Sequence, residues 1–246
     1  MGQRDYDAVV RRVEAVSGVD VYELGEVEGL PVLRVSAGRE DTPVVYINGG
    51  THGDEPAGVE AALAFLEREW DRWADRVRFE VVPCLCPWSY VHNARLNVQE
   101  VDVNWAFLRD DVPEIEILKG FVEGRVFAGV IDLHEDWESP GFYLYEMFDD
   151  RGSLGREMVK RVAQVCPINK QSEIEDEIAV NGVIHPNMEV SRRKYGEGIP
   201  IALYQRGHTG HLVTSESPTA QPMDVRVAAH LAAVEVMVEA NARDFI

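Results

Sequence analysis

A histidine and a glutamate three residues apart stand in the stretch His52-Gly53-Asp54-Glu55 and are two side chains that can bind a metal ion. A short apolar run precedes this stretch and Pro56 follows it, which predicts a position between a buried strand and the first turn of a helix. Imidazole nitrogen and carboxylate oxygen are suitable zinc ligands. The same pair could also be a solvent-facing histidine and a glutamate that interacts with a helix N-terminus, so the pair alone does not identify a metal site.

A second histidine, His134, stands at the end of residues 126–133, which we expect to be a buried strand. A catalytic zinc site needs three protein ligands and one open position for water. His52, Glu55 and His134 would supply these three ligands. We interpret the next two acids, Glu135 and Asp136, as a charged loop, with a role close to the metal as the alternative.

A carboxylate, Glu216, ends the stretch Thr214-Ser215-Glu216 and stands at the end of the expected strand 212–215. A carboxylate in that position can lie beside a metal-bound water. It would take a proton from the water as general base and return it to the departing amine. The alternative is an exposed loop glutamate, because the chain contains 43 acidic residues.

Alternating strands and helices must position these side chains. Hydrophobic periodicity and Gly/Pro signals predict helices over residues 5–16, 55–70, 114–123, 154–165 and 224–240, the last one capped by Asp224. They predict strands over residues 19–24, 30–36, 44–47, 77–84, 126–133, 142–147, 200–204 and 212–215, and irregular loops over 85–112 and 166–198. This order predicts a three-layer α/β/α fold with a mixed, mostly parallel central sheet. Residues 1–246 are expected to form a single catalytic domain, with its site at the carboxyl ends of the strands.

Composition limits the function classes. The formal net charge of -19 disfavours nucleic acid and anionic membrane surfaces as partners. Three cysteines do not make a disulfide framework. The chain has no run of 18 apolar residues and no apolar leader segment, so a cytoplasmic protein is expected. The sequence leaves the oligomeric state open.

Four stretches taken together resemble the M14 metallocarboxypeptidase superfamily, including its succinylglutamate desuccinylase and aspartoacylase branch. They are NGGTHGDEPAG (48–58), HNARLNVQEVDVNWAF (92–107), DLHED (132–136) and TSE (214–216), and they occur in the family's order. The resemblance implies a zinc carboxypeptidase-like fold, Zn²⁺ as cofactor, and cleavage of an amide bond by zinc-activated water. It implies that His52, Glu55 and His134 bind the zinc and that Glu216 is the general base.

The resemblance also assigns residues in the second stretch. It implies that Arg95 polarises the scissile carbonyl, which is a sensible task for a fixed guanidinium beside developing negative charge. It implies that Asp102 orients the first zinc-binding histidine, and that Asn104 helps to bind the substrate's carboxylate. One departure concerns substrate binding. The family motif Asp-x-Asn-Arg ends in an arginine that binds the terminal carboxylate, whereas this chain has Trp105, whose indole offers a single N–H donor.

The missing arginine leaves two explanations open: another cation replaces it, or the substrate lacks a free α-carboxylate at that point. Three groups of further candidates lie in the last third of the chain: arginines that could replace the missing cation, tyrosines that could assist catalysis, and two histidines. The replacements are Arg192, Arg193 and Arg206, the tyrosines are Tyr195 and Tyr204, and the histidines are His208 and His211. We interpret the two histidines as lining the pocket or facing solvent, with a second metal site as the alternative.

Three functions therefore compete. The first is a peptidase that removes a terminal residue from a small peptide. The second is an N-acyl amino acid amidohydrolase of the desuccinylase or aspartoacylase type, which the missing arginine favours over the first. The third, a non-catalytic zinc-binding protein on this fold, is disfavoured by the intact set of expected ligands, base and arginine.

Overall fold

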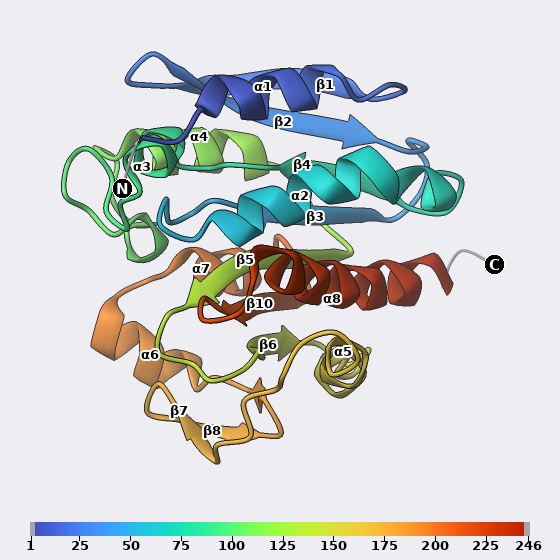
Figure 1. Cartoon of the computed structure of the whole chain (residues 1–246), viewed down its shortest axis with the longest axis vertical. Helices are drawn as coiled ribbons and strands as arrows, with labels where there is room; N and C mark the ends of the chain where they lie inside the picture. The colour runs from blue at the N-terminus through green and yellow to red at the C-terminus, as the bar shows by residue number, and fades with distance from the viewer. Residues whose placement is uncertain (1–2, 244–246) are drawn as a thin grey trace.

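The computed structural model describes residues 3–243, which form one mixed sheet with helices on both faces (Figure 1). Its strands are β1 (Asp20–Val27), β2 (Leu30–Ala37), β3 (Val44–Gly49), β4 (Arg78–Val82), β5 (Gly129–Asp136), β6 (Tyr143–Phe148), β7 (Glu173–Ile174), β8 (Glu177–Val180), β9 (Val183–Ile184) and β10 (His211–Pro218). Its helices are α1 (Tyr6–Glu14), α2 (Pro56–Arg68), α3 (Pro87–His92), α4 (Pro113–Val122), α5 (Gly155–Val162), α6 (Met188–Tyr195), α7 (Ile199–Gln205) and α8 (Met223–Arg243). Two short 3₁₀ helices are η1 (Trp70–Trp73) and η2 (Val103–Trp105).

The sheet has the strand order β1-β2-β4-β3-β5-β10-β6-β9-β8-β7. The four central strands β4, β3, β5 and β10 run parallel to one another. Antiparallel pairs, β1 with β2, β2 with β4, and β10 with β6, flank them on both sides. Because β3, β5 and β10 are parallel neighbours, their carboxyl ends meet at one edge of the sheet.

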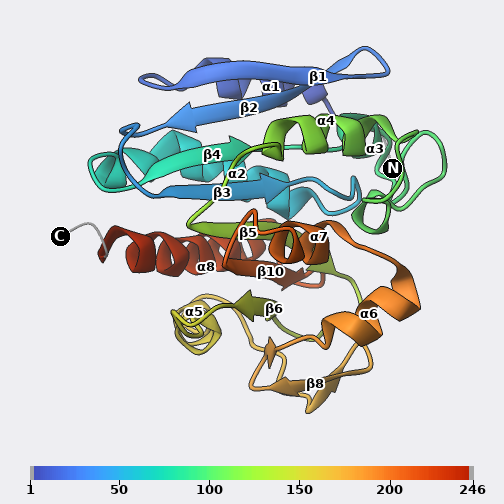
Figure 2. The same cartoon turned by 180° about the vertical axis from the view of Figure 1, so that it is seen from behind.

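Alternating side chains of the central strands build a separate core on each face. On one face, Ile47 of β3 and Leu133 of β5 pack in a cluster with side chains of α1, α2, α5 and α8. On the other face, Tyr46 and Val130 pack with α4 and α7. Figure 1 shows α2 and α8 in front of the sheet, and Figure 2, seen from behind, shows α4 and α7 on the opposite face. The predicted three-layer fold is therefore confirmed.

One strand prediction is wrong: residues 200–204 belong to helix α7. A short apolar run does not distinguish a buried helix from a strand, and Pro200 suits a first helical turn. Asp224 lies inside the first turn of α8 and not at its cap. The predicted loops also hold regular structure, since 85–112 contains α3 and η2, and 166–198 contains α6 and the short strands β7 to β9.

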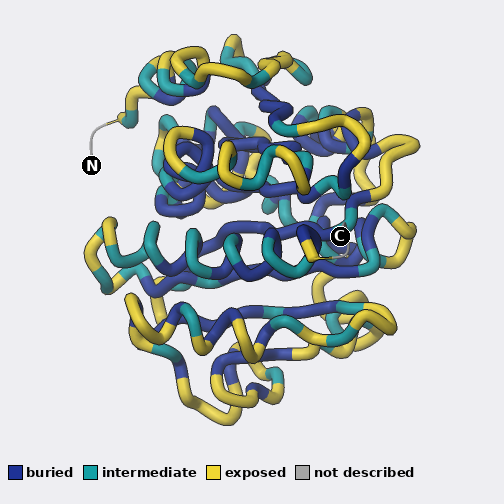
Figure 3. Tube along the Cα trace, turned by 90° about the vertical axis from the view of Figure 1, so that its right-hand side faces the viewer, coloured by how far each residue is buried: buried dark blue, intermediate teal, exposed yellow. Residues whose placement is uncertain are grey.

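Burial varies with position in the molecule. Figure 3 shows buried backbone in the middle of the molecule and exposed segments at its two outer ends. Cys84, Cys86 and Cys166 are buried free thiols. Over residues 3–243, no helix combines the length and apolar character needed to cross a bilayer.

Candidate metal centre

The turn after β3 carries His52 and Glu55 to the edge of the sheet. Gly50 has a φ of 65°, in the left-handed region that favours glycine, and lets the chain reverse directly after the strand. Gly53 packs so closely on α3 that a Cβ there would lie 1.9 Å from the carbonyl carbon of Ser89. Glu55 directly precedes α2, whose first turn holds Pro56. Backbone geometry and close packing therefore constrain this turn, and both potential ligands lie together at the sheet edge.

The pleat and register of β5 and β10 position His134 and Glu216. Leu133 points into the core with α2, so His134 points to the opposite face. The register of the parallel pair sets Glu216 of β10 directly across from His134. Two residues separated by more than 80 positions in the sequence therefore become cross-strand neighbours on one face.

Three buried side chains converge above that edge. Nδ1 of His52 lies 2.7 Å from Oε1 of Glu55, and Nδ1 of His134 lies 2.8 Å from Oε2 of the same carboxylate. Their potential ligand atoms all lie within 4.8 Å of one another. In the part of the chain that the structure describes, no other cluster of three or more His, Cys, Asp or Glu side chains has this geometry.

The protonation chemistry of this cluster suits a cation between the three groups. Nε2 of His52 lies 3.0 Å from Oδ1 of Asp102. If that nitrogen donates its proton to Asp102, the lone pair of Nδ1 faces the Glu55 carboxylate, and this is repulsive without a proton or metal ion between them. Burial opposes a charge on His52, yet Glu55 and Asp102 outweigh it and raise the pKa of His52. Two nitrogens and a carboxylate fit zinc, whose charge would balance the site.

Arg95 and Asp102 lie beside the cluster. Nη1 of Arg95 donates to Oε1 of Glu55 at 3.1 Å, and its Nε donates to Oδ2 of Asp102 at 3.2 Å. Burial works against the charge of Arg95, but the carboxylates of Asp102 and Glu55 outweigh it and raise the pKa of Arg95. The guanidinium therefore stays positively charged within reach of whatever Glu55 binds.

Glu216 lies within electrostatic reach of this cluster. Burial raises the pKa of the Glu216 carboxyl, and the negative charges of Glu55 and Asp136 add to that, against the opposing charge of His134. The arrangement gives this carboxyl a pKa closer to neutrality than that of an ordinary glutamate. A group in such a state is suited to transferring protons near neutral pH.

The η2 segment brings Asn104 and Trp105 next to Asp102. Oδ1 of Asn104 is buried without a hydrogen-bond partner among the described residues. The Trp105 ring lies 4.9 Å from the Tyr195 ring of α6 and packs on Gly198, where a Cβ would come within 2.8 Å of the indole. Position 105 is therefore an aromatic surface continued by Tyr195, which is half-exposed.

The other candidate tyrosine, Tyr204, packs against the hydrophobic core. Its hydroxyl donates to the carbonyl of Phe148 at 2.8 Å, and its ring packs against the cluster below α7.

Two of the three candidate replacement cations share one buried carboxylate. Nη2 of Arg206 lies 2.8 Å from Glu197, and Nη2 of Arg192 lies 3.4 Å from it. Glu197 is 6% exposed, so its charge requires at least one of these two arginines as a partner. Arg193 is exposed on α6.

The interpretation of Glu135 and Asp136 as a charged loop is wrong. The Glu135 side chain is buried, accepts a hydrogen bond from the amide of Ala57 in the first turn of α2, and pairs with Arg226 of α8. Asp136 accepts from the Tyr143 hydroxyl at 3.0 Å. Both acids end β5, and each has a partner on another element, α2 and α8 for Glu135 and β6 for Asp136.

We therefore expect Glu135→Ala to lower the free energy of unfolding by about 3–5 kcal/mol, because it leaves Arg226 buried without its partner. Chemical denaturation in the presence of a chelator measures this loss without a contribution from bound metal. Glu138→Ala, at an exposed position on the same connection, should change the free energy by less than about 0.5 kcal/mol. Equal losses of unfolding free energy in both variants would contradict a stabilising role for the pair of Glu135 and Arg226.

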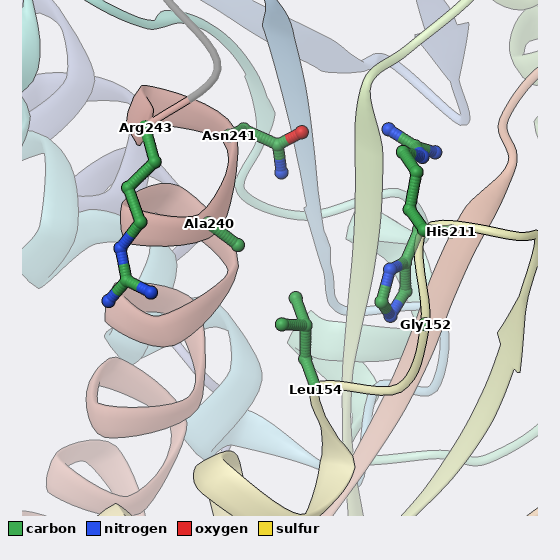
Figure 4. A pocket seen from close by; sticks show the side chains of 7 residues that line it. Gly152, Leu154, His211, Ala240, Asn241 and Arg243 are labelled. Carbon is green, nitrogen blue, oxygen red and sulfur yellow. The ribbon is translucent and has the colours of Figure 1, made fainter.

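The two further histidines lie away from the cluster. His211 begins β10, five residues before Glu216 and roughly 17 Å from it along an extended strand. Its Nε2 lies 2.9 Å from the buried carboxylate of Glu146, and its side chain lines a hollow of about 320 Å³ at that end of the sheet, with Leu154 and Asn241 (Figure 4). His208 is half-exposed, and its Nδ1 lies 3.1 Å from the carbonyl of Arg125. Neither histidine belongs to the three-residue cluster.

One residue beside the cluster was missed by the sequence analysis. Oδ2 of Asp132 lies 3.1 Å from Nε2 of His134, and Asp132 is 3% exposed. Its spacing was the available signal, since residues two apart on a strand share a face.

Comparison with known proteins supports the fold. No protein-family model and no curated protein matches the sequence. Among solved structures, the chain is similar to a protein of Shewanella denitrificans provisionally described as a metallopeptidase, with 22% identity, a TM-score of 0.84, and coverage of 97% of this chain and 91% of that one. It is similar to a metallo-carboxypeptidase from Burkholderia cenocepacia, with 19% identity, a TM-score of 0.70, and coverage of 95% and 68%. Carboxypeptidase A from Helicoverpa armigera matches at 15% identity and a TM-score of 0.71, over 98% and 74%.

Proposed function

We propose that this chain, which has the fold of the metallocarboxypeptidases, is a zinc-dependent hydrolase of amide bonds. The single observation that carries the proposal is the convergence of His52, Glu55 and His134 on one point at the carboxyl edge of such a fold. A bound zinc would supply Lewis acidity toward a water molecule and the scissile carbonyl. The three side chains would hold it through two imidazole nitrogens and one carboxylate.

Three other residues of the site would take part in the reaction. Glu216 would take a proton from the attacking water and return it to the departing nitrogen, which its raised pKa supports. Arg95 would turn from Glu55 toward the oxygen of the scissile carbonyl, where negative charge develops during attack. Asp102 would hold the His52 ring through Nε2, so that Nδ1 faces the metal position.

The surroundings of Trp105 favour a substrate that has no free carboxylate at that position. The indole and Tyr195 present aromatic surface, and Glu197 binds both Arg192 and Arg206. A small amide with an uncharged leaving group would stack on this surface. This favours an amidohydrolase of N-acylated compounds over a peptidase that requires a C-terminal carboxylate.

We therefore expect the protein to hydrolyse an N-acyl aromatic amino acid and its C-terminal amide with kcat/KM values within about tenfold of each other. A buried guanidinium–carboxylate pair contributes about 2–5 kcal/mol, which would give roughly 30-fold or more in favour of the free acid. The two substrates should be compared with zinc-loaded protein at matched concentrations.

A strong preference for the free acid would contradict this substrate proposal. Arg193→Ala would then show whether the one candidate arginine that does not pair with Glu197 supplies the missing cation, because that preference would disappear in the variant. Zinc-loaded protein without turnover on a broad panel of peptides and N-acyl amino acids would instead favour a non-catalytic binding protein.

A further inference from the structure

The two histidines of the cluster have matching surroundings. Each has its Nδ1 against one oxygen of Glu55, and each has its Nε2 close to an aspartate. For His52 that aspartate is Asp102, at 3.0 Å. For His134 it is Asp132, at 3.1 Å. The second pair is the more deeply buried, because the side chains of Asp132 and His134 are only 4% and 3% exposed.

A chain of buried donors fixes the Asp132 carboxylate from behind. Nδ2 of Asn48 donates to Oδ1 of Asp132 at 2.7 Å, across the parallel pair of β3 and β5. The hydroxyl of Tyr46 donates to Oδ1 of Asn48 at 2.9 Å. Burial, with the Asp132 charge second, raises the pKa of Tyr46 well above its ordinary value, so this hydroxyl remains a donor. The sheet thus sets which Asp132 oxygen is free to face His134.

The free oxygen has His134 as its close neighbour. Oδ2 of Asp132 and Nε2 of His134 are both buried, and neither has a partner in hydrogen-bond geometry within the described chain. Their 3.1 Å contact is an ion pair whose alignment falls short of a hydrogen bond. A buried carboxylate in this state requires positive charge beyond it. An imidazole that carries its proton on Nε2 and a cation on Nδ1 provides that charge.

We propose that Asp132 is a positioning residue of the metal site, which orients the His134 ring and keeps its proton on Nε2. The inference rests on the proposed function, since it assigns Asp132 a task toward the metal that His134 would bind. Asp132 does not touch the metal or the substrate. It acts through His134, in the way that second carboxylates raise the basicity of metal-binding histidines.

Zinc titration of the metal-free protein against a competing chromophoric chelator tests the proposal. We expect Asp132→Asn to weaken zinc binding by about 10–100-fold. Cobalt substituted for zinc should also show a shifted visible absorption spectrum, because the His134 ring changes its orientation. The unfolding temperature of the metal-free variant should not fall, because the change removes an incompletely compensated buried charge. A residue with only a structural role would lower that temperature and leave the cobalt spectrum unchanged.

Two further variants separate the possible causes. Asn48→Leu removes the donor that holds Oδ1 of Asp132 and should weaken zinc binding less than Asp132→Asn does. Asp136→Asn makes the same substitution on the same strand, at a carboxylate bound to Tyr143 and backbone amides. It should leave zinc affinity and the cobalt spectrum unchanged.

Parent-like zinc affinity and spectrum in Asp132→Asn would overturn the inference and leave the proposed function standing. Absence of zinc or cobalt binding by the parent protein would overturn both together.

Discussion

Replacing Glu216 by glutamine is expected to lower kcat by about 10²–10⁴-fold, the usual contribution of one proton-transfer group. The substitution preserves the size of the side chain but removes its charge and its ability to accept a proton. Glu216 is a cross-strand neighbour of His134 and has no place among the three converging side chains. The variant should therefore bind zinc as the parent does. Steady-state kinetics and a zinc titration on the same preparation measure both effects.

Glu138→Gln is the matched control for this experiment. It removes a carboxylate from an exposed position after β5, on the connection that follows Asp136. We expect its kcat to equal that of the parent. A Glu216→Gln variant with near-parental kcat would exclude Glu216 as the base, whereas loss of zinc from that variant would place its carboxylate among the ligands.

Removing one of the converging imidazoles, by His134→Ala, is expected to abolish both turnover and the stabilisation of the fold by zinc. A ligand that binds only the folded state stabilises it by about 4 kcal/mol at a thousandfold excess over its dissociation constant. Zinc should therefore raise the unfolding temperature of the metal-free parent clearly and leave that of His134→Ala unchanged. Thermal unfolding with and without added zinc checks this.

His92→Ala provides the comparison for loss of a histidine as such. His92 lies on α3, with its ring stacked on Trp88 and its Nδ1 near the Trp88 carbonyl. Its variant should keep the full response to zinc. An undiminished response in His134→Ala would show that zinc binds elsewhere in the chain, and the proposed metal centre would be wrong.

Much of the fold follows from local patterns. The apolar runs around residues 44–47 and 130–133 are buried strands because their side chains pack on both faces of a parallel sheet. Pro56 lies in the first turn of α2, where its missing N–H costs no hydrogen bond. Gly50 permits the reversal of the chain before that helix. Local patterns failed at residues 200–204, where a short apolar run has no period long enough to separate helix from strand.

The candidate site likewise depends partly on local sequence and partly on tertiary structure. The sequence by itself determined which side chains could bind a metal and that they stand at strand ends, because residue type and strand-to-helix transitions are local properties. Tertiary structure decided which carboxylate faces which imidazole. The register of β5 against β3 pairs Asp132 with Asn48, and the packing of α8 buries Glu135 against Arg226. Such contacts depend on the angle and depth of packing between distant segments, which no spacing along one chain specifies.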